Sequence, residues 1–221
     1  MRLNKYIAQA TGLSRRAADA AIAEGRVVIN DHSVRMGQAV ESGDIVKLDG
    51  MPLSLHLETQ TIMLNKPAGY ICSRDGQGGK TIYDLLPPEL HHLKPVGRLD
   101  KYSSGLLLLT NDGQLAQELA HPKYQKQKTY EVRVAKPLQP LHRQMIQDNG
   151  IMLDDGVSKF ALERIKDGND NEWKVVMREG RNRQIRRTFD ALGYSVTRLH
   201  RTHFGTYSLG GLRGATYTPV A

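Results

Sequence analysis

The feature that most constrains the fold is a run of four leucines at residues 106–109. It is the longest purely aliphatic run in the chain, and it is far shorter than the roughly 18 apolar residues that span a bilayer. Gly105 precedes it, and the turn sequence Asn111-Asp112-Gly113 follows one residue after it. A short apolar run bounded by turn residues predicts a buried strand. The chain must therefore build a core around this strand.

The first 50 residues predict a small α+β unit of two helices followed by short strands. Apolar residues recur at helical spacing from Leu3 to Ala10, and Ser14 suits the N-cap of a second helix over residues 15–24. A linker is expected near residues 54–59. We therefore expect two domains, residues 1–57 and residues 58–221.

The second domain is predicted to be rich in strands with interspersed helices, which makes the fold class α+β. The expected strands are residues 61–64, 106–110, 129–134, 173–177 and 195–200. The expected helices are residues 81–86, 114–120, 141–147 and 183–192.

Charge is concentrated in one segment of this basic chain. The formal net charge is +8, and residues 178–201 contain seven arginines against Glu179 and Asp190. This pattern predicts a polyanionic partner, and nucleic acid is favoured over a membrane because no basic helix has a bulky apolar face. A solvated basic surface is the alternative. A charged fraction of 24% in 221 residues excludes an intrinsically disordered chain.

The N-terminus shows no export signal, because it leads into an amphipathic pattern rather than an apolar core. The one cysteine, Cys72, excludes an internal disulfide and a multi-cysteine metal site. We expect a soluble, cytoplasmic protein.

Two motifs suggest a nucleotide site and a metal site, but neither motif has the residues or spacing that such a site requires. Residues 76–81 end in Gly-Lys-Thr, but a phosphate loop requires a glycine where this chain has Arg74. His200 and His203 would point to opposite faces of a strand, which does not suit a shared metal. We therefore expect neither a nucleotide cofactor nor a metal.

The N-terminal helices carry a candidate phosphate site. Arg15 and Arg16 lie in the first turn of the second helix, where backbone N–H groups and the helix dipole already favour an anion. Arg2, Lys5 and Arg26 extend this surface. The alternatives are a generic helical pair and a DNA-reading helix-turn-helix, but the second helix is mostly alanine and lacks base-reading side chains.

Three separate elements carry the candidate chemistry. Asp100 lies in the loop before the leucine strand, where Arg98 and Lys101 would hold it ionised; taken alone, it reads as a turn residue. Tyr130 lies at the head of a strand. In the helix over residues 183–192, Arg186 lies on the flank of the apolar stripe, where it could pair with a carboxylate. Arg183 and Arg187 are expected to face away from the core.

The order and spacing of these motifs resemble a known family. Residues 1–50, with Gly12-Leu13-Ser14-Arg15-Arg16 and Glu24-Gly25-Arg26, resemble the S4 RNA-binding domain. The Gly97-Arg98-Leu99-Asp100 and Arg183-Gln184-Ile185-Arg186 elements resemble the pseudouridine synthases that carry an S4 domain and modify ribosomal RNA. The resemblance implies a catalytic domain built on a mainly antiparallel mixed sheet with flanking helices.

The resemblance also implies a reaction, the isomerisation of a ribosomal RNA uridine to pseudouridine, without cofactor or metal. Asp100 would be the essential carboxylate, as nucleophile or as base; Tyr130 would stack on the uracil, and Arg186 would orient Asp100. The RNA contacts are expected at Arg2, Lys5, Arg15, Arg16, Arg26, Arg98, Arg183 and Arg187.

Large-subunit RNA is weakly favoured, and the expected partner is ribosomal RNA, free or in an assembling subunit, bound by a monomer that does not contact membranes. The competing function is a non-catalytic RNA-binding or ribosome-assembly protein.

Overall fold

The computed structural model describes residues 1–55, 59–76 and 78–220. The chain divides into two compact units, Met1–Thr59 and Gln60–Ala221. The predicted domain boundary between residues 57 and 58 lies outside the described residues, as does the centre of the expected linker. None of the helices in the described part of the chain has the length and apolar character that crossing a membrane requires.

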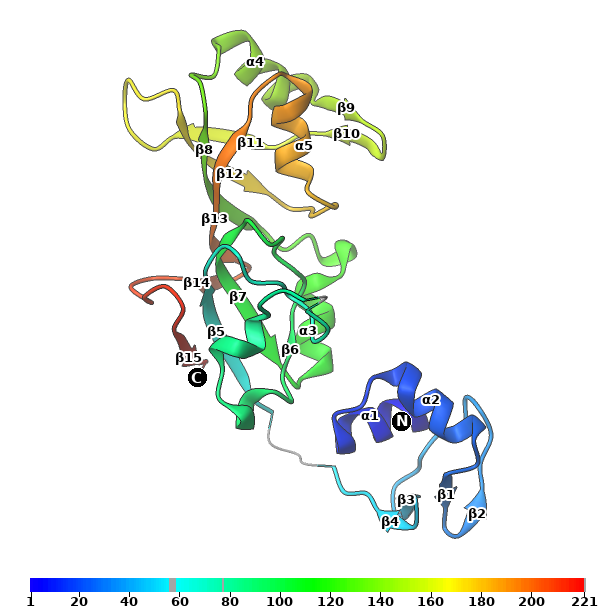
Figure 1. Cartoon of the computed structure of the whole chain (residues 1–221). Coiled ribbons are helices and arrows are strands. Elements are labelled where there is room, and N and C mark those ends of the chain that lie inside the picture. Colours follow the sequence, from blue (N-terminus) through cyan, green and yellow to red (C-terminus); the bar gives the residue numbers. More distant parts are fainter. Residues whose placement is uncertain (56–58, 77, 221) are drawn as a thin grey trace. The chain divides into compact units, whose positions relative to one another are not determined.

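The first unit contains two helices and a small antiparallel sheet, as predicted (Figure 1). Ser14 caps the second helix, because its side chain accepts a hydrogen bond of 3.0 Å from the backbone N–H of Ala17. Leu3, Ile7 and Ile22 from the two helices share a core with Val27 and other strand residues. The elements are α1 (Leu3–Thr11), α2 (Arg15–Ala23), β1 (Val27–Ile29), β2 (His32–Ser33), β3 (Val46–Leu48) and β4 (Met51–Pro52), with the sheet order β2-β1-β3-β4.

The second unit is built on a mixed sheet in which β13 pairs in parallel with β7 and the other neighbouring pairs are antiparallel. The predicted α+β class is therefore confirmed. Along the sheet the order is β11 (Ala161–Arg164), β12 (Glu172–Met177), β8 (Lys128–Val134), β13 (Val196–Phe204), β7 (Ser104–Thr110), β5 (Thr61–Lys66) and β15 (Tyr217–Pro219); β14 (Tyr207–Ser208) pairs with β13, and β6 (Lys94–Pro95) pairs with β7.

The leucine run forms most of β7, an interior strand of this sheet. Leu107 and Leu109 pack into one hydrophobic cluster, and Leu106 and Leu108 pack into another on the opposite face. All four side chains are fully buried. A strand covered on both faces reads as a continuous apolar run rather than an alternating one, which explains the run at residues 106–109.

The helices of the second unit begin and end close to the predicted positions, with two differences. The expected helix at residues 81–86 is a 3₁₀ turn (Ile82–Leu85) capped by Thr81, and the expected start of the last helix is displaced by one residue. The helices are α3 (Gly113–Ala120), α4 (Pro140–Gln144), which continues as a π-helical turn (Met145–Asn149), and α5 (Gln184–Ala191); further 3₁₀ turns are Pro88–Leu90 and Pro122–Tyr124.

A short hairpin of β9 (Ile151–Leu153) and β10 (Gly156–Ser158) lies against α5 (Figure 1). Because α5 carries Arg186, this hairpin contributes to the position of one predicted site residue.

Candidate active site

A pocket of about 560 Å³ lies in the second unit, around the loop that leads into β7. Asp100 and Tyr130 both line it, from the loop and from β8 respectively. Arg98 and Arg183 also line it, whereas Arg186 and Arg187 are not among the lining residues. The other walls come from residues 71–73, from the segment between β12 and α5, and from β13.

The loop that carries Asp100 is held by a buried lysine. Lys66, at the end of β5, is fully buried, and its Nζ donates to the carbonyl oxygens of Pro67 (3.0 Å), Asp100 (3.2 Å) and Ser103 (2.7 Å). Burial lowers the pKa of Lys66, since the charged form loses hydration. The three carbonyl dipoles offset this cost, and they tie both ends of the Asp100 turn to the sheet.

Gly105 allows the turn to meet the sheet closely. It has a φ of +104°, and a Cβ at this position would overlap the backbone of Arg201 on the neighbouring β13. Only glycine has neither the side chain nor the conformational penalty. The close approach brings the Asp100 loop and β13 together at one end of the pocket.

The carboxylate of Asp100 is held in one orientation by a backbone N–H of its own turn and by two arginines distant in sequence. Its Oδ1 accepts the backbone N–H of Tyr102 at 2.9 Å, and its Oδ2 lies 3.3 Å from Nε of Arg186 and 3.7 Å from Nη1 of Arg183. The side chain is 22% exposed, so it is sheltered and yet reachable from the pocket.

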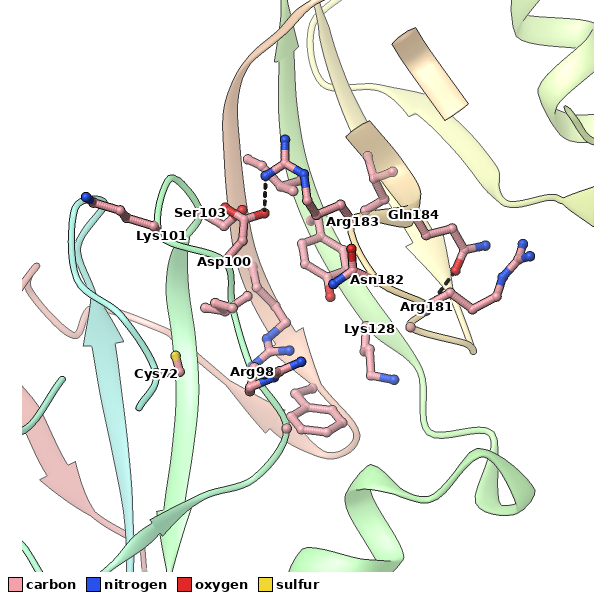
Figure 2. Close-up of a pocket in the computed structure, with 18 of the residues that line it drawn as sticks. Cys72, Arg98, Asp100, Lys101, Ser103, Lys128, Arg181, Asn182, Arg183 and Gln184 are labelled. Carbon is pink, nitrogen blue, oxygen red and sulfur yellow. Dashed lines mark hydrogen bonds and ion pairs between the residues drawn. The ribbon is translucent and has the colours of Figure 1, made fainter. Parts of the chain in front are cut away.

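The sequence neighbours of Asp100 do not provide its ion pairs. Within the described residues these pairs come from Arg183 and from Arg186, the partner that the family resemblance implies, whereas Arg98 and Lys101, which we expect to hold Asp100 ionised, form no ion pair with it. Figure 2 shows the Lys101 side chain pointing away from Asp100. In a tight turn the adjacent side chains diverge, so neighbours in sequence are not necessarily neighbours in space.

Arg186 lies behind Asp100, and each of its three guanidinium nitrogens donates a hydrogen bond there. Its side chain is 9% exposed; Nη1 donates to the carbonyl of Val196 at 2.9 Å, and Nη2 donates to the carbonyl of Tyr102 at 3.1 Å and the hydroxyl of Ser103 at 3.3 Å. A planar guanidinium with this many acceptors has little freedom to rotate. This geometry suits a positioning residue, and it agrees with the flanking position expected for Arg186.

Arg183 does not face away from the site, which corrects the expectation from helical periodicity. It is the N-cap of α5 rather than its first helical residue, and its backbone is in the left-handed region (φ 47°, ψ 30°). The rotation of 100° per residue applies only within a helix, so it does not predict the direction of this side chain. Figure 2 shows Arg183 over the pocket beside Asp100.

Arg187 is also engaged, in a clamp with the β9–β10 hairpin. Its Nη1 and Nη2 donate to the carboxylate of Asp155 at 3.1 Å and 2.7 Å, and Arg181 reaches the same carboxylate at 2.9 Å. The hydrogen bonds from Arg187 lower the pKa of Asp155. The outward direction expected for Arg187 therefore ends on an acidic partner rather than on open surface.

Tyr130 lies on β8 between β12 and β13, opposite Val175 and Arg201. It is 8% exposed and lines the pocket. Lys128 lies two residues earlier on the same strand and therefore on the same face. Both side chains line the pocket.

In the first unit, the predicted RNA contacts differ in how free their side chains are. Arg2, Lys5 and Arg16 are exposed, and Arg15 is exposed with one hydrogen bond to Asn4. Arg26 instead makes a two-pronged contact with the carboxylate of Asp49 (2.8 Å and 2.6 Å), which raises its pKa.

Sequence reasoning assigned no role to Lys66, Lys128 or Arg201, although all three shape the pocket. The signal for Lys66 is a lysine at the end of an apolar strand, directly before a proline. Lys128 stands two residues before Tyr130, so strand alternation alone places it beside that residue. No local pattern shows that Arg201 is buried.

Comparison with known proteins finds matches for both units. Residues 60–191 match the model of a family described as RNA pseudouridylate synthase, and residues 1–46 match the S4 domain. A crystal structure of a pseudouridylate synthase is 33% identical, with a TM-score of 0.72, and covers 100% of this chain and 96% of that chain.

Two curated relatives, from Xanthomonas campestris and Bacillus subtilis, are both named ribosomal large subunit pseudouridine synthase B. The first is 39% identical over 94% of this chain, and the chain spans 44% of its length. The second is 37% identical over 96% of this chain, and the chain spans 88% of its length. Because this family model matches residues 60–191, more than half of the chain and the part that contains Asp100, Tyr130 and Arg186, this chain belongs to the RNA pseudouridylate synthase family.

Proposed function

We propose that this protein converts a specific uridine of ribosomal RNA to pseudouridine, with large-subunit RNA as the favoured substrate. The observation that carries the proposal is the placement of Asp100 and Tyr130 in one pocket, with Arg186 fixing the carboxylate from behind. A protein that only bound RNA would need the basic surfaces but not this arrangement. The names of the two relatives support the choice of large-subunit RNA.

The reaction is an isomerisation, so its atoms and electrons balance without a co-reactant. The bond between N1 of uracil and C1′ of ribose breaks, and a bond between C5 and C1′ forms. C5 loses a proton, and N1 gains one. Asp100 is suited to this task because it is paired with Arg183 and Arg186, sheltered and open to the pocket; it serves either as the nucleophile at C1′ or as the base that removes a ribose proton.

Tyr130 supplies the face on which the uracil stacks. Its ring belongs to a central strand, so its position does not depend on a mobile loop. A uridine in folded RNA must leave its stack to reach this pocket, at a cost of a few kcal/mol. Phosphate contacts elsewhere on the protein offset that cost.

We propose that the first domain supplies many of these contacts, through Arg2, Lys5, Arg15 and Arg16. Arg98 and Arg183 contribute at the pocket. Arg26 and Arg187 are better suited to stabilising their own domains, because each guanidinium already contacts a carboxylate. Ribosomal RNA, free or in an assembling subunit, is then the partner of a cytoplasmic monomer.

The decisive experiment maps pseudouridine across ribosomal RNA from cells with and without this protein. One uridine should lose its modification in the deletion strain and regain it when the wild-type protein is supplied. The purified protein should form pseudouridine at the same uridine in unmodified RNA. If the map does not change, and the purified protein binds RNA without modifying it, the non-catalytic alternative is correct.

A further inference from the structure

The part of the pocket away from the Asp100–Arg183 pair is lined by three cations from three different elements. Arg98 comes from the loop before β7, Lys128 from β8 and Arg201 from β13. Figure 2 shows the Arg98 and Lys128 side chains directed toward this region. Nζ of Lys128 and Cζ of Arg201 lie 5.4 Å and 4.8 Å from the centre of the same Phe204 ring. We call Arg98, Lys128 and Arg201 the cation cluster.

The cation cluster has no acidic partner within the described residues, unlike the arginines beside Asp100. Arg201 is 2% exposed; its Nε donates to the carbonyl of Leu106 at 2.8 Å, but its buried Nη2 has no acceptor in the described part of the chain. Besides the Phe204 ring, Lys128 has within the described residues one long hydrogen bond, of 3.4 Å, to the carbonyl of Glu179. Burial and the neighbouring Arg201 lower the pKa of Lys128.

Holding Lys128 and Arg201 together, largely away from water and without an ion pair, costs free energy, whereas Arg98 is exposed. A bound anion would offset this cost at both Lys128 and Arg201. The Phe204 ring compensates only in part, since a cation–π contact does not satisfy an N–H donor. The pocket is therefore divided electrostatically, with a balanced end at Asp100 and an end where the negative charge of Glu179 only partly offsets Lys128.

A phosphodiester fits this end best. It is a single anion with several acceptor oxygens, which suits both the compact ammonium of a lysine and the forked guanidinium of an arginine. Uracil oxygens are neutral and would leave the excess charge unbalanced.

We propose that the cation cluster binds the phosphodiester group directly adjacent to the uridine that Asp100 addresses. Lys128 and Arg98 contact the phosphate, and Arg201 supplies positive charge from beneath. This inference rests on the proposed function, because it takes the occupant of the pocket to be RNA. As a consequence, the phosphate backbone of the RNA is held at one end of the pocket. The base and ribose of the uridine are then presented to Tyr130 and Asp100 at the other end.

The test measures binding rather than turnover, in an Asp100→Asn background. The probe is a ribosomal RNA hairpin that contains the uridine contacted by this variant, as located by cross-linking. It is made either with normal phosphodiester linkages or with one neutral methylphosphonate on one side of that uridine. Lys128→Met removes the charge and keeps the apolar stem on Phe204, whereas Lys128→Arg keeps the charge. Lys174→Met is the matched control, because Lys174 is exposed on β12 and pairs with Glu163 outside the pocket.

We expect Lys128→Met to weaken binding of the normal hairpin by about tenfold, as loss of a charged hydrogen bond does. A methylphosphonate at one of the two flanking linkages should weaken binding to the Asp100→Asn protein, with Lys128 intact, by the same factor. Combining the two changes should add little, because both remove the same contact. Lys128→Arg should restore most of the affinity, and Lys174→Met should have no effect.

The proposal is overturned if the affinity loss caused by Lys128→Met and the loss caused by the methylphosphonate multiply, whichever of the two flanking linkages is modified. Lys128 would then contact the base or another phosphate. The proposal is also overturned if neither methylphosphonate weakens binding more than one placed three nucleotides away. That comparison needs no Lys128 variant, so it holds even if Lys128→Met does not fold. Wild-type protein is assayed for pseudouridine on the same hairpin: its absence, together with the expected binding pattern, refutes the proposed function and leaves the phosphate site intact.

Discussion

At the scale of single residues, the site depends on charges whose partners are remote in sequence. Asp100 is separated from Arg186 by 86 positions, yet Arg186 contacts it directly while its Nη1 and Nη2 donate to the carbonyls of Val196 and Tyr102. Lys66 holds the backbone of the same turn from a third element. One carboxylate is therefore oriented by two cations that act differently, one on its oxygen and one on its main chain.

Asp100→Asn should reduce turnover by at least about 10²-fold, because the amide can act neither as a nucleophile nor as a base. RNA affinity should stay within a few fold, since little volume changes. Release of tritium from C5-labelled uridine in ribosomal RNA measures turnover, and filter binding measures affinity. Turnover within about tenfold of wild type would remove Asp100 from the mechanism.

Arg186→Ala should slow the bound-state chemical step far more than it weakens RNA binding, because Arg186 orients Asp100 without lining the pocket. Breaking this nearly buried pair should also cost about 3 kcal/mol of unfolding free energy. Arg186→Lys should recover part of the single-turnover rate.

Arg183→Ala is the comparison for this variant. Its longer contact of 3.7 Å and more exposed side chain predict a smaller loss of rate and a larger share of the effect in binding. A loss of affinity alone in Arg186→Ala, with an unchanged single-turnover rate, would contradict the positioning role.

At the scale of elements, two sets of contacts hold the arginine-rich N-terminal part of α5 in place. Arg186 connects it to the Asp100 loop, and Arg187 with Arg181 connects it to Asp155 in the β9–β10 turn. Gln184 adds a buried hydrogen bond of 3.0 Å to Ser158 on β10. The hairpin therefore acts as a brace for the helix that orients the carboxylate.

Asp155→Ala should have at least the phenotype of Arg187→Ala, because it removes the contact with Arg187 and also the contact with Arg181. Both variants should lower the single-turnover rate moderately and leave the salt dependence of RNA binding unchanged, and the double variant should be no worse than Asp155→Ala. If Arg187 instead contacted a phosphate, Arg187→Ala alone would reduce the salt slope by about 0.7. Binding measured from low to high salt on the three variants distinguishes the two roles.

At the scale of the whole molecule, each unit has a hydrophobic core of its own. The core of the first unit contains Leu3, Ile7 and Val46, and the clusters of the second unit surround β7 and β8. The residues that line the pocket all belong to the second unit. We therefore assign chemistry to the second unit and additional RNA affinity to the first.

Deleting residues 1–57 should leave a folded protein that binds ribosomal RNA more weakly and with a smaller salt slope, since Arg2, Lys5, Arg15 and Arg16 are lost. At saturating RNA its single-turnover rate should be close to that of the full chain. Circular dichroism checks the fold, and rates at rising protein concentration separate binding from chemistry. An unfolded fragment would show that the two units depend on each other.

The sequence by itself determined the α+β class, the buried strand at residues 106–109 and the capped helix that follows Ser14, because these depend on near neighbours and on side-chain period. The flanking position of Arg186 followed in the same way. Only the tertiary structure decided that Arg183 turns toward Asp100, that Arg187 ends on Asp155, and that Lys128 and Arg201 share one ring. A left-handed helix cap breaks the periodicity, and partners on separate strands are brought together by sheet order. Neither effect is encoded in local sequence spacing. The partners of the charged residues around the pocket could therefore be identified only from the tertiary structure.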